Sequence, residues 1–512
     1  MKKDIAIIGG SLGGVMAAIG CASQGKSVYL CEETDWLGGQ LTSQAVPPDE
    51  HKWIEHFGCT KTYREFRNRI RDYYRNHEQA SDELKMKETF CPGNSWVSRI
   101  AHEPKVAVDI LNEMIEPYRH LIQIDYFTVA TDSVVENDVI KSVTVSNKKN
   151  GEVKVVFANY YLDATDCGDL LPIVKAEYRT GAESNSETNE PHAPEIADST
   201  DLQPITWVVA LELDADGDYK IEKPEMYDYF KELVVPYADC NLLSWYGPDA
   251  LTQDKCEFSF YDYELGENRL GFWSYRRIID SRNYKDGRKE VSLINWPEND
   301  FYLGNIYDDE NAEKNKELAK QQTMSVVYWL QNEAPRQDGK KGYPVKLRPD
   351  IMGTKDGLAK APYIRESRRI VAQKIVREQD VSKKTNNHPP VFEDSVGVGH
   401  YAIDIHLTTK SHTFLYDSVY PFEIPLSAMI PIRLKNLIPA CKNIGCTHLT
   451  NGCYRLHPVE WNIGEVAGLL SAYCVENSVT PLEVYQNHLK DFQDFIQSYG
   501  VQLHWDFDKM EI

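Results

Sequence analysis

The sequence lacks the features that mark several specialised classes of protein. It has no run of roughly 18–20 apolar residues, the length that crosses a bilayer, and the apolar run after Lys2 and Lys3 is shorter than the roughly 7–15 residues of a signal-peptide core. Positive charge is also scarce: 56 basic residues against 78 acidic ones give a net charge of −22. Such a chain is poorly suited to bind nucleic-acid phosphates or an anionic membrane surface. We therefore expect a cytoplasmic protein with no nucleic-acid partner and no membrane insertion.

Paired cysteines are absent as well. The eleven cysteines are scattered and include no Cys-x-x-Cys pair, which argues against a zinc ribbon and against a disulfide framework. Cys441, Cys446 and Cys453 lie closer together, but their spacing matches neither a redox pair nor a ferredoxin-type cluster. We expect reduced, mostly buried thiols and no bound metal.

The length and composition are those of a globular protein with more than one domain. At 512 residues the chain exceeds the size at which a single hydrophobic core stops growing, roughly 250–300 residues. Its 42% hydrophobic and 26% charged residues are ordinary for a soluble fold. Two closely packed domains are the natural expectation.

The first residues predict a strand, a glycine-rich turn and a helix. A buried strand over residues 5–8 runs into Gly9-Gly10-Ser11-Leu12-Gly13-Gly14, and a helix of small residues follows. Unpaired backbone N–H groups at such a helix start, together with its dipole, bind a dinucleotide diphosphate. Ser11 replaces the middle glycine of the usual fingerprint, and Gly10 and Gly13 relieve the crowding that its Cβ introduces. The predicted cofactor contacts of this turn are Gly9, Ser11, Leu12, Gly13 and Gly14.

An acidic residue follows the second predicted strand. Residues 27–31 form that strand, and Glu32 stands at its end, about 20 residues past the glycines, where a carboxylate binds a ribose 2′-hydroxyl. Glu33 is the alternative if the register differs by one residue. Neither position offers an arginine for a 2′-phosphate.

Three later segments resemble the FAD-binding fold of the glutathione-reductase type. The first is a second glycine pair, Gly38-Gly39-Gln40, which in that fold lies along the extended cofactor. The second is a hairpin, with strands over 139–145 and 152–157 joined through Asn-Gly. It leads into a strand and turn, where the resemblance implies that Ala164 and Thr165 lie near the adenine of FAD.

The third segment lies near the C-terminus. A final strand over 436–443 precedes a polar loop over 447–462 and a helix over 463–472. In the family this helix points its N-terminus at the flavin ring, which implies contacts from Asn462 and Ile463. The acidic residue that usually binds the ribityl chain is missing, and Asn443 is its substitute.

Further stretches, including residues 362–370 and 450–462, are similar to a bacterial group of FAD-dependent oxidoreductases. The resemblance implies an α/β fold: a Rossmann-like FAD-binding domain with ββα three-layer architecture, an inserted mixed α+β substrate domain and a C-terminal helix. We expect the FAD-binding domain at 1–45, 100–170 and 426–475, a helical insertion at 46–99, a cap at 171–425 and a helical tail at 476–512. In the insertion, Arg64, Arg67 and Arg71 are expected on a solvated face opposite an aromatic stripe.

Histidines are the candidates for proton transfer, because the pKa of imidazole lies near neutrality. His457 is the first choice, since it precedes the flavin-facing helix beside Tyr454 and Arg455. His448 is the second. His400 and His406, with Asp404 between them, are the third. Arg365 and Arg368 are candidate substrate ligands, although an ion-pair network on a helix explains them equally well.

These features predict an FAD-dependent enzyme that moves a hydride from a small polar substrate, an alcohol, sugar-like compound or amine, to flavin N5. The alternatives are a non-redox or group-transfer flavoprotein, or a flavin subunit that is inactive without its complex. The electron acceptor is oxygen, a quinone or a carrier protein, and the chain is compatible with a homo-oligomer.

Overall fold

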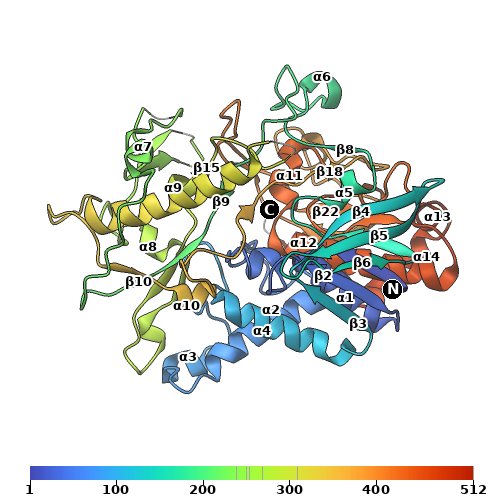
Figure 1. Ribbon diagram of the computed structural model, residues 1–512, viewed down its shortest axis with the longest axis horizontal. Helices are drawn as coiled ribbons and strands as arrows, with labels where there is room; N and C mark the ends of the chain where they lie inside the picture. The colour runs from blue at the N-terminus through green and yellow to red at the C-terminus, as the bar shows by residue number, and fades with distance from the viewer. Residues whose placement is uncertain (238, 250, 253, 268, 308–309, 511–512) are drawn as a thin grey trace.

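A five-stranded parallel sheet forms the centre of the molecule. The computed structural model describes residues 1–237, 239–249, 251–252, 254–267, 269–307 and 310–510 (Figure 1). The strand order is β23-β7-β1-β2-β3. The strands are β1 (Ile5–Ile8), β2 (Val28–Glu32), β3 (Ile122–Tyr126), β7 (Tyr160–Asp163) and β23 (Leu437–Pro439). β1, β2, β7 and β23 are buried throughout, as expected for a parallel sheet that is covered on both faces.

The sheet is the middle of three layers. On one face, Ala6, Ile8 and Tyr29 share a core with an antiparallel meander. The meander consists of β4 (Thr128–Glu136), β5 (Val139–Asn147) and β6 (Val153–Val156). On the other face lie α1 (Leu12–Ser23), α4 (Pro104–Ile115) and α12 (His457–Asn477). This arrangement confirms the predicted Rossmann-like, three-layer α/β fold, and the meander gains the strand β4, which the hairpin pattern did not include.

Glycines bring α1 and α12 into direct backbone contact. A Cβ atom added at Gly464 would lie 2.2 Å from the Gly13 carbonyl oxygen, and one at Gly468 would lie 2.3 Å from the Ala17 carbonyl oxygen. Larger side chains at these positions would force the helices apart. The close approach holds the start of α12 beside the glycine-rich turn, although the two are separated by more than 400 residues.

The insertion after β2 contains α2 (Lys61–Arg75) and α3 (Asp82–Met86). The predicted stripe of Tyr63, Phe66, Ile70 and Tyr74 is buried. The prediction of a solvated basic face was wrong for Arg67 and Arg71, because both side chains are buried. Arg67 Nε donates to Glu50 Oε1 at 2.8 Å, and Arg71 Nη2 donates to Glu55 Oε1 at 2.6 Å. Acidic partners upstream, which helical periodicity does not reveal, allow these guanidinium groups to be buried.

The cap is a mixed α+β region that lies beside the sheet domain, with the long helix α9 running across it (Figure 1). Its largest sheet has the order β13-β14-β10-β16, and a second sheet has the order β15-β9-β17. The helices between β7 and β23 are α5 (Leu170–Ile173), α6 (Asn185–Thr188), α7 (Tyr227–Glu232), α8 (Phe272–Tyr275), α9 (Ala312–Asn332) and α10 (Pro349–Met352). The strands of the same stretch are β8 (Tyr178–Arg179), β9 (Ile205–Thr206), β10 (Val209–Leu213), β11 (Tyr246–Pro248), β12 (Lys255–Glu257), β13 (Arg277–Ile279), β14 (Val291–Ile294), β15 (Asp300–Phe301), β16 (Val345–Leu347), β17 (Tyr363–Ile364), β18 (Arg369–Ile370), β19 (Ser395–Gly399), β20 (Ile403–Ile405), β21 (Leu415–Asp417) and β22 (Phe422–Pro425). Among them, α5 and β18 pack in the core that the sheet shares with the meander.

The C-terminal part corrects two predictions. The expected polar loop over 447–462 is helical: α11 (His448–Tyr454) is capped by Thr447, and α12 begins at His457 with a proline in its first turn. The expected single tail helix is two helices, α13 (Pro481–Asn487) and α14 (Leu489–Ser498), which meet at His488. No helix among the described residues is long and apolar enough to cross a membrane.

Candidate functional site

The glycine-rich turn presents backbone N–H groups at the start of α1. Gly9 has a φ of +100°, and the Ser11 side chain turns back to accept a hydrogen bond from the Gly14 N–H at 3.3 Å. Ser11 therefore caps the helix, and its extra Cβ costs the turn little. The Gly13 N–H donates to Glu460 Oε1 at 3.2 Å. Within the described part of the chain, the N–H groups of Ser11 and Leu12 have no acceptor.

The two acidic residues after β2 have different environments. Glu32 is buried, and its Oε2 accepts the Gly10 N–H at 2.9 Å while its Oε1 accepts the Thr34 N–H at 2.8 Å. Burial raises the pKa of Glu32 to about 7. Glu33 points outward to Lys148, at 2.5 Å. Only Glu32 faces the glycine-rich turn, so the structure favours the first of the two registers.

The second glycine pair lies against the first. Gly38 and Gly39 both have positive φ angles, of 110° and 48°, and a Cβ at Gly39 would lie 3.1 Å from the Ser11 Cα atom. The Gln40 side chain is buried and donates from Nε2 to the Arg455 carbonyl oxygen at 3.0 Å. Its Oε1 is buried without a hydrogen-bond partner among the described residues.

The turn after β7 packs on the opposite side of the glycine-rich turn. The Ala164 N–H donates to the Ile8 carbonyl oxygen at 2.7 Å, and a Cβ at Gly9 would lie 2.4 Å from the Ala164 carbonyl group. Thr165 Oγ1 donates to Asp163 Oδ1 at 2.8 Å. The predicted cofactor residues of β1, β2, β7 and the second glycine pair thus lie around one turn.

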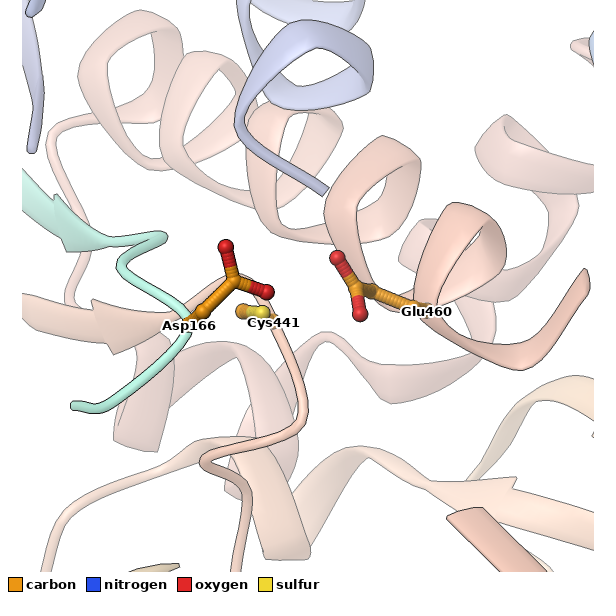
Figure 2. Close-up of side chains that lie close together, drawn as sticks. All are labelled: Asp166, Cys441 and Glu460. Carbon is orange, nitrogen blue, oxygen red and sulfur yellow. The ribbon is translucent and has the colours of Figure 1, made fainter. Parts of the chain in front are cut away.

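Two carboxylates and a thiol meet beside this region: Asp166 follows β7, Cys441 follows β23 and Glu460 belongs to α12 (Figure 2). Lys442 Nζ lies 2.5 Å from Asp166 Oδ1 and 3.3 Å from Glu460 Oε2, and all three groups come from different segments. Although burial opposes a charged amine, Asp166, Cys441 and Glu460 hold the pKa of Lys442 well above its usual value. The ammonium group occupies the space between the two carboxylates that would otherwise hold a cation.

Asn443, Asn462 and Ile463 are also part of this region. Asn443 Oδ1 accepts the Cys441 N–H at 3.2 Å and its Nδ2 donates to the Asp163 carbonyl oxygen at 3.1 Å, so the amide holds the β23 and β7 ends together. Asn462 Nδ2 donates to the Val396 carbonyl oxygen at 3.1 Å, and Ile463 is fully buried inside α12. Lys442, which the sequence interpretation treated only as a departure from the family pattern, faces the turn more directly than Asn443 does.

This set fits a dinucleotide. Two N–H groups at the helix start are without acceptors, and the third is held by a carboxylate, which shows that the position attracts an anionic oxygen. Glu32 lies at the end of β2, where a ribose is bound in such folds. The unpaired Gln40 oxygen adds a buried acceptor next to α12.

A cavity of about 690 Å³ is lined mainly by cap residues, with Asp49, Trp96 and Val97 of the insertion and with Arg455. Its deep wall carries three arginine–aspartate pairs from separate parts of the chain. Arg276 Nη1 lies 3.0 Å from Asp49 Oδ1. Arg365 Nη2 lies 2.8 Å from Asp300 Oδ1, and Arg455 Nη2 lies 3.2 Å from Asp404 Oδ2. All six side chains are buried or nearly so.

His406 joins two of these pairs. Its Nδ1 lies 2.6 Å from Asp300 Oδ2, and its Nε2 lies 3.5 Å from Asp404 Oδ2. Burial alone would raise the pKa of Asp404, but His406 and the guanidinium of Arg455 lower it to about 2. The pKa of Asp300 is likewise lowered, because Arg365 and His406 outweigh its burial. The imidazole side chain is 25% exposed and lines the cavity.

The first-choice histidine does not reach this cavity. His457 is fully buried: its Nδ1 accepts the Asp49 N–H at 3.3 Å, and its Nε2 lies 3.0 Å from the Val46 carbonyl oxygen, to which it must donate. Burial lowers its pKa to about 3. Both ring nitrogens are used to hold residues 46–49 against α12, so the geometry contradicts a role as the proton acceptor.

Some of the other candidates line the cavity and some lie outside it. His448 Nδ1 lies 3.0 Å from both Glu366 carboxylate oxygens, inside the core. The Tyr454 hydroxyl donates to the Glu423 carbonyl oxygen at 2.6 Å, and the ring of His400 packs on Trp53 at 5.2 Å. Arg368 pairs with Asp169 at 2.8 Å. Of the predicted catalytic and substrate residues, those that line the cavity are Arg365, His406 and Arg455, together with Asp404.

The residues that sequence reasoning missed are Asp49, Arg276, Asp300 and Tyr363, whose hydroxyl accepts from Arg455 Nη1 at 2.7 Å. The prediction that a helix carries the ion-pair network of residues 365–369 was wrong. Residues 365–368 lie between the short strands β17 and β18, and Arg369 begins β18. Their charges are paired, as the ion-pair interpretation expected. No local pattern marks the four missed residues.

Comparison with known families identifies the cofactor. The profile of the family described as FAD dependent oxidoreductase matches residues 4–495, nearly the whole chain. The chain belongs to this family. It is therefore an FAD-dependent oxidoreductase.

Similarity of this family member to other proteins is low. No curated protein sequence matches it. Among solved structures, a geranylgeranyl bacteriochlorophyll reductase-like protein from Thermoplasma acidophilum is 10% identical, covering 98% of this chain and 85% of that one, with a TM-score of 0.33. The flavin-dependent monooxygenase PieE, in complex with FAD and substrate, is 11% identical over 74% of this chain and 52% of its own, with a TM-score of 0.31. L-proline dehydrogenase from P. horikoshii is 16% identical, covering 37% of this chain and 25% of the dehydrogenase chain, with a TM-score of 0.18.

Proposed function

We propose that the enzyme oxidises a small polar substrate, an alcohol, sugar-like compound or amine, bound in the cavity of the cap. Glu32 would bind the adenosine ribose of FAD, and the N–H groups of Ser11 and Leu12 would bind the diphosphate. Lys442 would balance the phosphate charge. Bound FAD supplies the acceptor for a hydride from the substrate. The cavity supports this proposal because Arg455 and Asp49, on its wall, adjoin the first residues of α12.

The single observation that carries the proposal is the geometry of His406. Nδ1 lies 2.6 Å from Asp300 Oδ2 and the imidazole lines the cavity, so Nδ1 would donate to Asp300 and Nε2 would meet the substrate. Nε2 lies 3.5 Å from Asp404, too far for a strong hydrogen bond. His406 would therefore take the substrate O–H or N–H proton while the neighbouring carbon loses its hydride. Arg365 would hold Asp300 in place from the other side.

The first experiment is an absorption spectrum of the purified enzyme, followed by anaerobic titration with a panel of sugars, alcohols and amines. We expect flavin bands that bleach with one class of compound. Flavin bands that no compound bleaches, together with tight binding of one of them, would instead support a non-redox flavoprotein. Reoxidation with oxygen or a quinone then identifies the class of electron acceptor.

Replacing the proposed base tests its role directly. His406→Asn should slow flavin reduction about 10²–10⁴-fold, the usual contribution of general base catalysis, without loss of bound FAD. Stopped-flow absorbance under anaerobic conditions measures this rate. His412→Asn is the matched control, since His412 is exposed and has a φ of 55°, which asparagine tolerates. A His406→Asn enzyme that is reduced as fast as the control would remove His406 from the mechanism.

A further inference from the structure

The substrate cavity has two chemically different ends. The polar end is built by the three arginine–aspartate pairs, His406 and Tyr363. Hydrogen bonds join His406 to Asp300 and Tyr363 to Arg455. The other end is built mainly by residues 235–270 of the cap. Its apolar members are Val235, Leu242, Pro248, Leu251, Leu265 and Leu270. Asp249, Glu257 and Arg269 of the same segment also line the cavity, and Glu257 and Arg269 are exposed to solvent, which screens their charges.

The charges of the polar end balance. Arg276, Arg365 and Arg455 contribute three positive charges, and their aspartate partners contribute three negative charges. A carboxylate substrate needs an unpaired guanidinium group, and an ammonium substrate needs an unpaired carboxylate. Paired side chains instead offer both N–H donors and carboxylate acceptors at once. That combination suits the hydroxyl groups of a neutral polyol, each of which donates and accepts.

The apolar end is large and partly open. Trp296 lies in the wall with Phe258 at 5.2 Å and Tyr275 at 4.6 Å, both in edge-to-face contact. At the mouth, Leu251 is 77% exposed although it lines the cavity. Aliphatic and aromatic side chains that line a cavity favour an apolar ligand group there, because its burial removes both surfaces from water.

Taking the proposed oxidation as given, we infer that the substrate is a neutral, amphipathic polyol: a hydroxylated ring that occupies the polar end and carries an apolar alkyl or aryl group in the other. The ring places one C–H and its hydroxyl at His406. The apolar group supplies affinity. This combination narrows the alternatives of alcohol, sugar-like compound and amine to a glycoside-like molecule.

The test compares matched pairs of ligands on the FAD-loaded enzyme. Methyl and hexyl β-glucosides and β-galactosides are titrated by calorimetry below their micelle concentrations, with oxidised enzyme and no turnover. For at least one sugar we expect binding to tighten by up to about fourfold per added methylene. Gluconate and glucosamine should bind more weakly than the neutral glycoside of the same ring. Equal affinity for methyl and hexyl forms, no binding of any pair, or preference for a charged ring would each overturn the inference.

Two variants test where in the cavity the alkyl group of the ligand binds. Leu270→Gln should weaken hexyl glycoside binding at least tenfold and leave methyl glycoside binding unchanged, while Leu482→Gln, at a half-buried leucine of α13 outside the cavity, changes neither. Equal loss for both ligands, or none, would contradict the assignment. Calorimetry does not depend on oxidation, so chain-length-dependent binding without flavin bleaching would refute the proposed function alone. Bleaching by a polar compound with no chain-length effect would refute this inference alone.

Discussion

At the scale of single residues, two histidines of this enzyme have different hydrogen-bond partners. His457 and His406 are both imidazoles within reach of aspartates of the cavity. His457 meets only backbone groups with its ring nitrogens, whereas His406 lies between the carboxylates of Asp300 and Asp404 and lines the cavity. The difference lies in the partners that the fold brings to each ring. Residue type alone does not distinguish them.

His457 should make stability depend on pH in acid. Its pKa is lowered to about 3 in the folded enzyme by burial, whereas an unfolded histidine titrates near 6.5. The unfolded chain therefore binds the extra proton between these values, and stability falls as pH drops below about 6.5, by about 1.4 kcal/mol per pH unit for one proton. His457→Gln keeps a donor and an acceptor but does not titrate.

Urea unfolding of both proteins at about pH 7.5 and about pH 5 measures the effect. We expect the glutamine variant to be less stable at the higher pH, by about 1–2 kcal/mol, and this gap to close at the lower pH. Other buried groups titrate equally in both proteins and cancel. A gap that stays constant would show that His457 is not the titrating group.

At the scale of elements, the contact between α1 and α12 controls the cofactor region. The two helices touch through glycine backbone, and the first turn of α12 supplies Glu460 to the Gly13 N–H. The position of α12 therefore sets the position of the N–H groups proposed to bind the FAD diphosphate. The sequence interpretation identified this helix but began it at residue 463, because polar residues before it were taken as a loop.

Gly464→Ala should be destabilising, although alanine normally favours a helix over glycine by about 1 kcal/mol. The added Cβ would lie 2.2 Å from the Gly13 carbonyl oxygen, which is backbone and moves only with the whole turn. We expect a loss of about 1–3 kcal/mol in unfolding free energy and weaker FAD binding, measured by flavin fluorescence titration. Asn477→Ala, at the exposed end of the same helix, is the control. Unchanged stability and FAD affinity would contradict the close-contact account.

At the scale of the whole molecule, buried ion pairs connect the sheet domain and its insertion to the cap. Asp49 precedes α2, and Arg276 lies directly before β13 of the cap, yet their side chains form two hydrogen bonds of 3.0 and 3.1 Å. Each of the two side chains has only 7% of its surface accessible to water. Breaking such a pair leaves an uncompensated buried charge.

A double-mutant cycle measures this connection. Asp49→Asn and Arg276→Gln should each cost about 3–5 kcal/mol in unfolding free energy. The double variant should cost clearly less than their sum, because it leaves no unpaired charge. Additive losses would mean that the two residues stabilise the enzyme independently. Lys289→Gln, whose partner Asp216 is largely exposed, serves as the control and should cost little.

The cofactor could be predicted from sequence because its signals are local. A buried strand, six residues of glycine-rich turn and a helix of small residues form within about 20 residues of one another, and Glu32 follows at a set distance. The meander and β7 were recognisable for the same reason: alternation and turn residues are properties of neighbours in sequence. The structure confirms the strands and the helix at these places.

Local signals failed where partners are distant. Arg67 and Arg71 were placed on a solvated face because helical spacing says nothing about Glu50 and Glu55. The His448–Tyr454 helix was taken as a loop because a buried helix can carry many polar residues when distant segments satisfy them. In this case Glu366 and Glu423 do so.

By itself, the sequence determined a dinucleotide-binding unit, since strand–turn–helix geometry follows from the spacing of apolar, glycine and acidic residues within one segment. The resemblance of later segments to the glutathione-reductase type of fold added the fold class and FAD. The tertiary structure alone decided which charged groups meet in the cavity. Asp49, Arg276, Asp300, His406 and Arg455 are spread over some 400 residues and contact one another only after the cap packs on the sheet domain. Pairing, burial and the availability of a lone pair depend on those long-range contacts, and no short stretch of sequence encodes them.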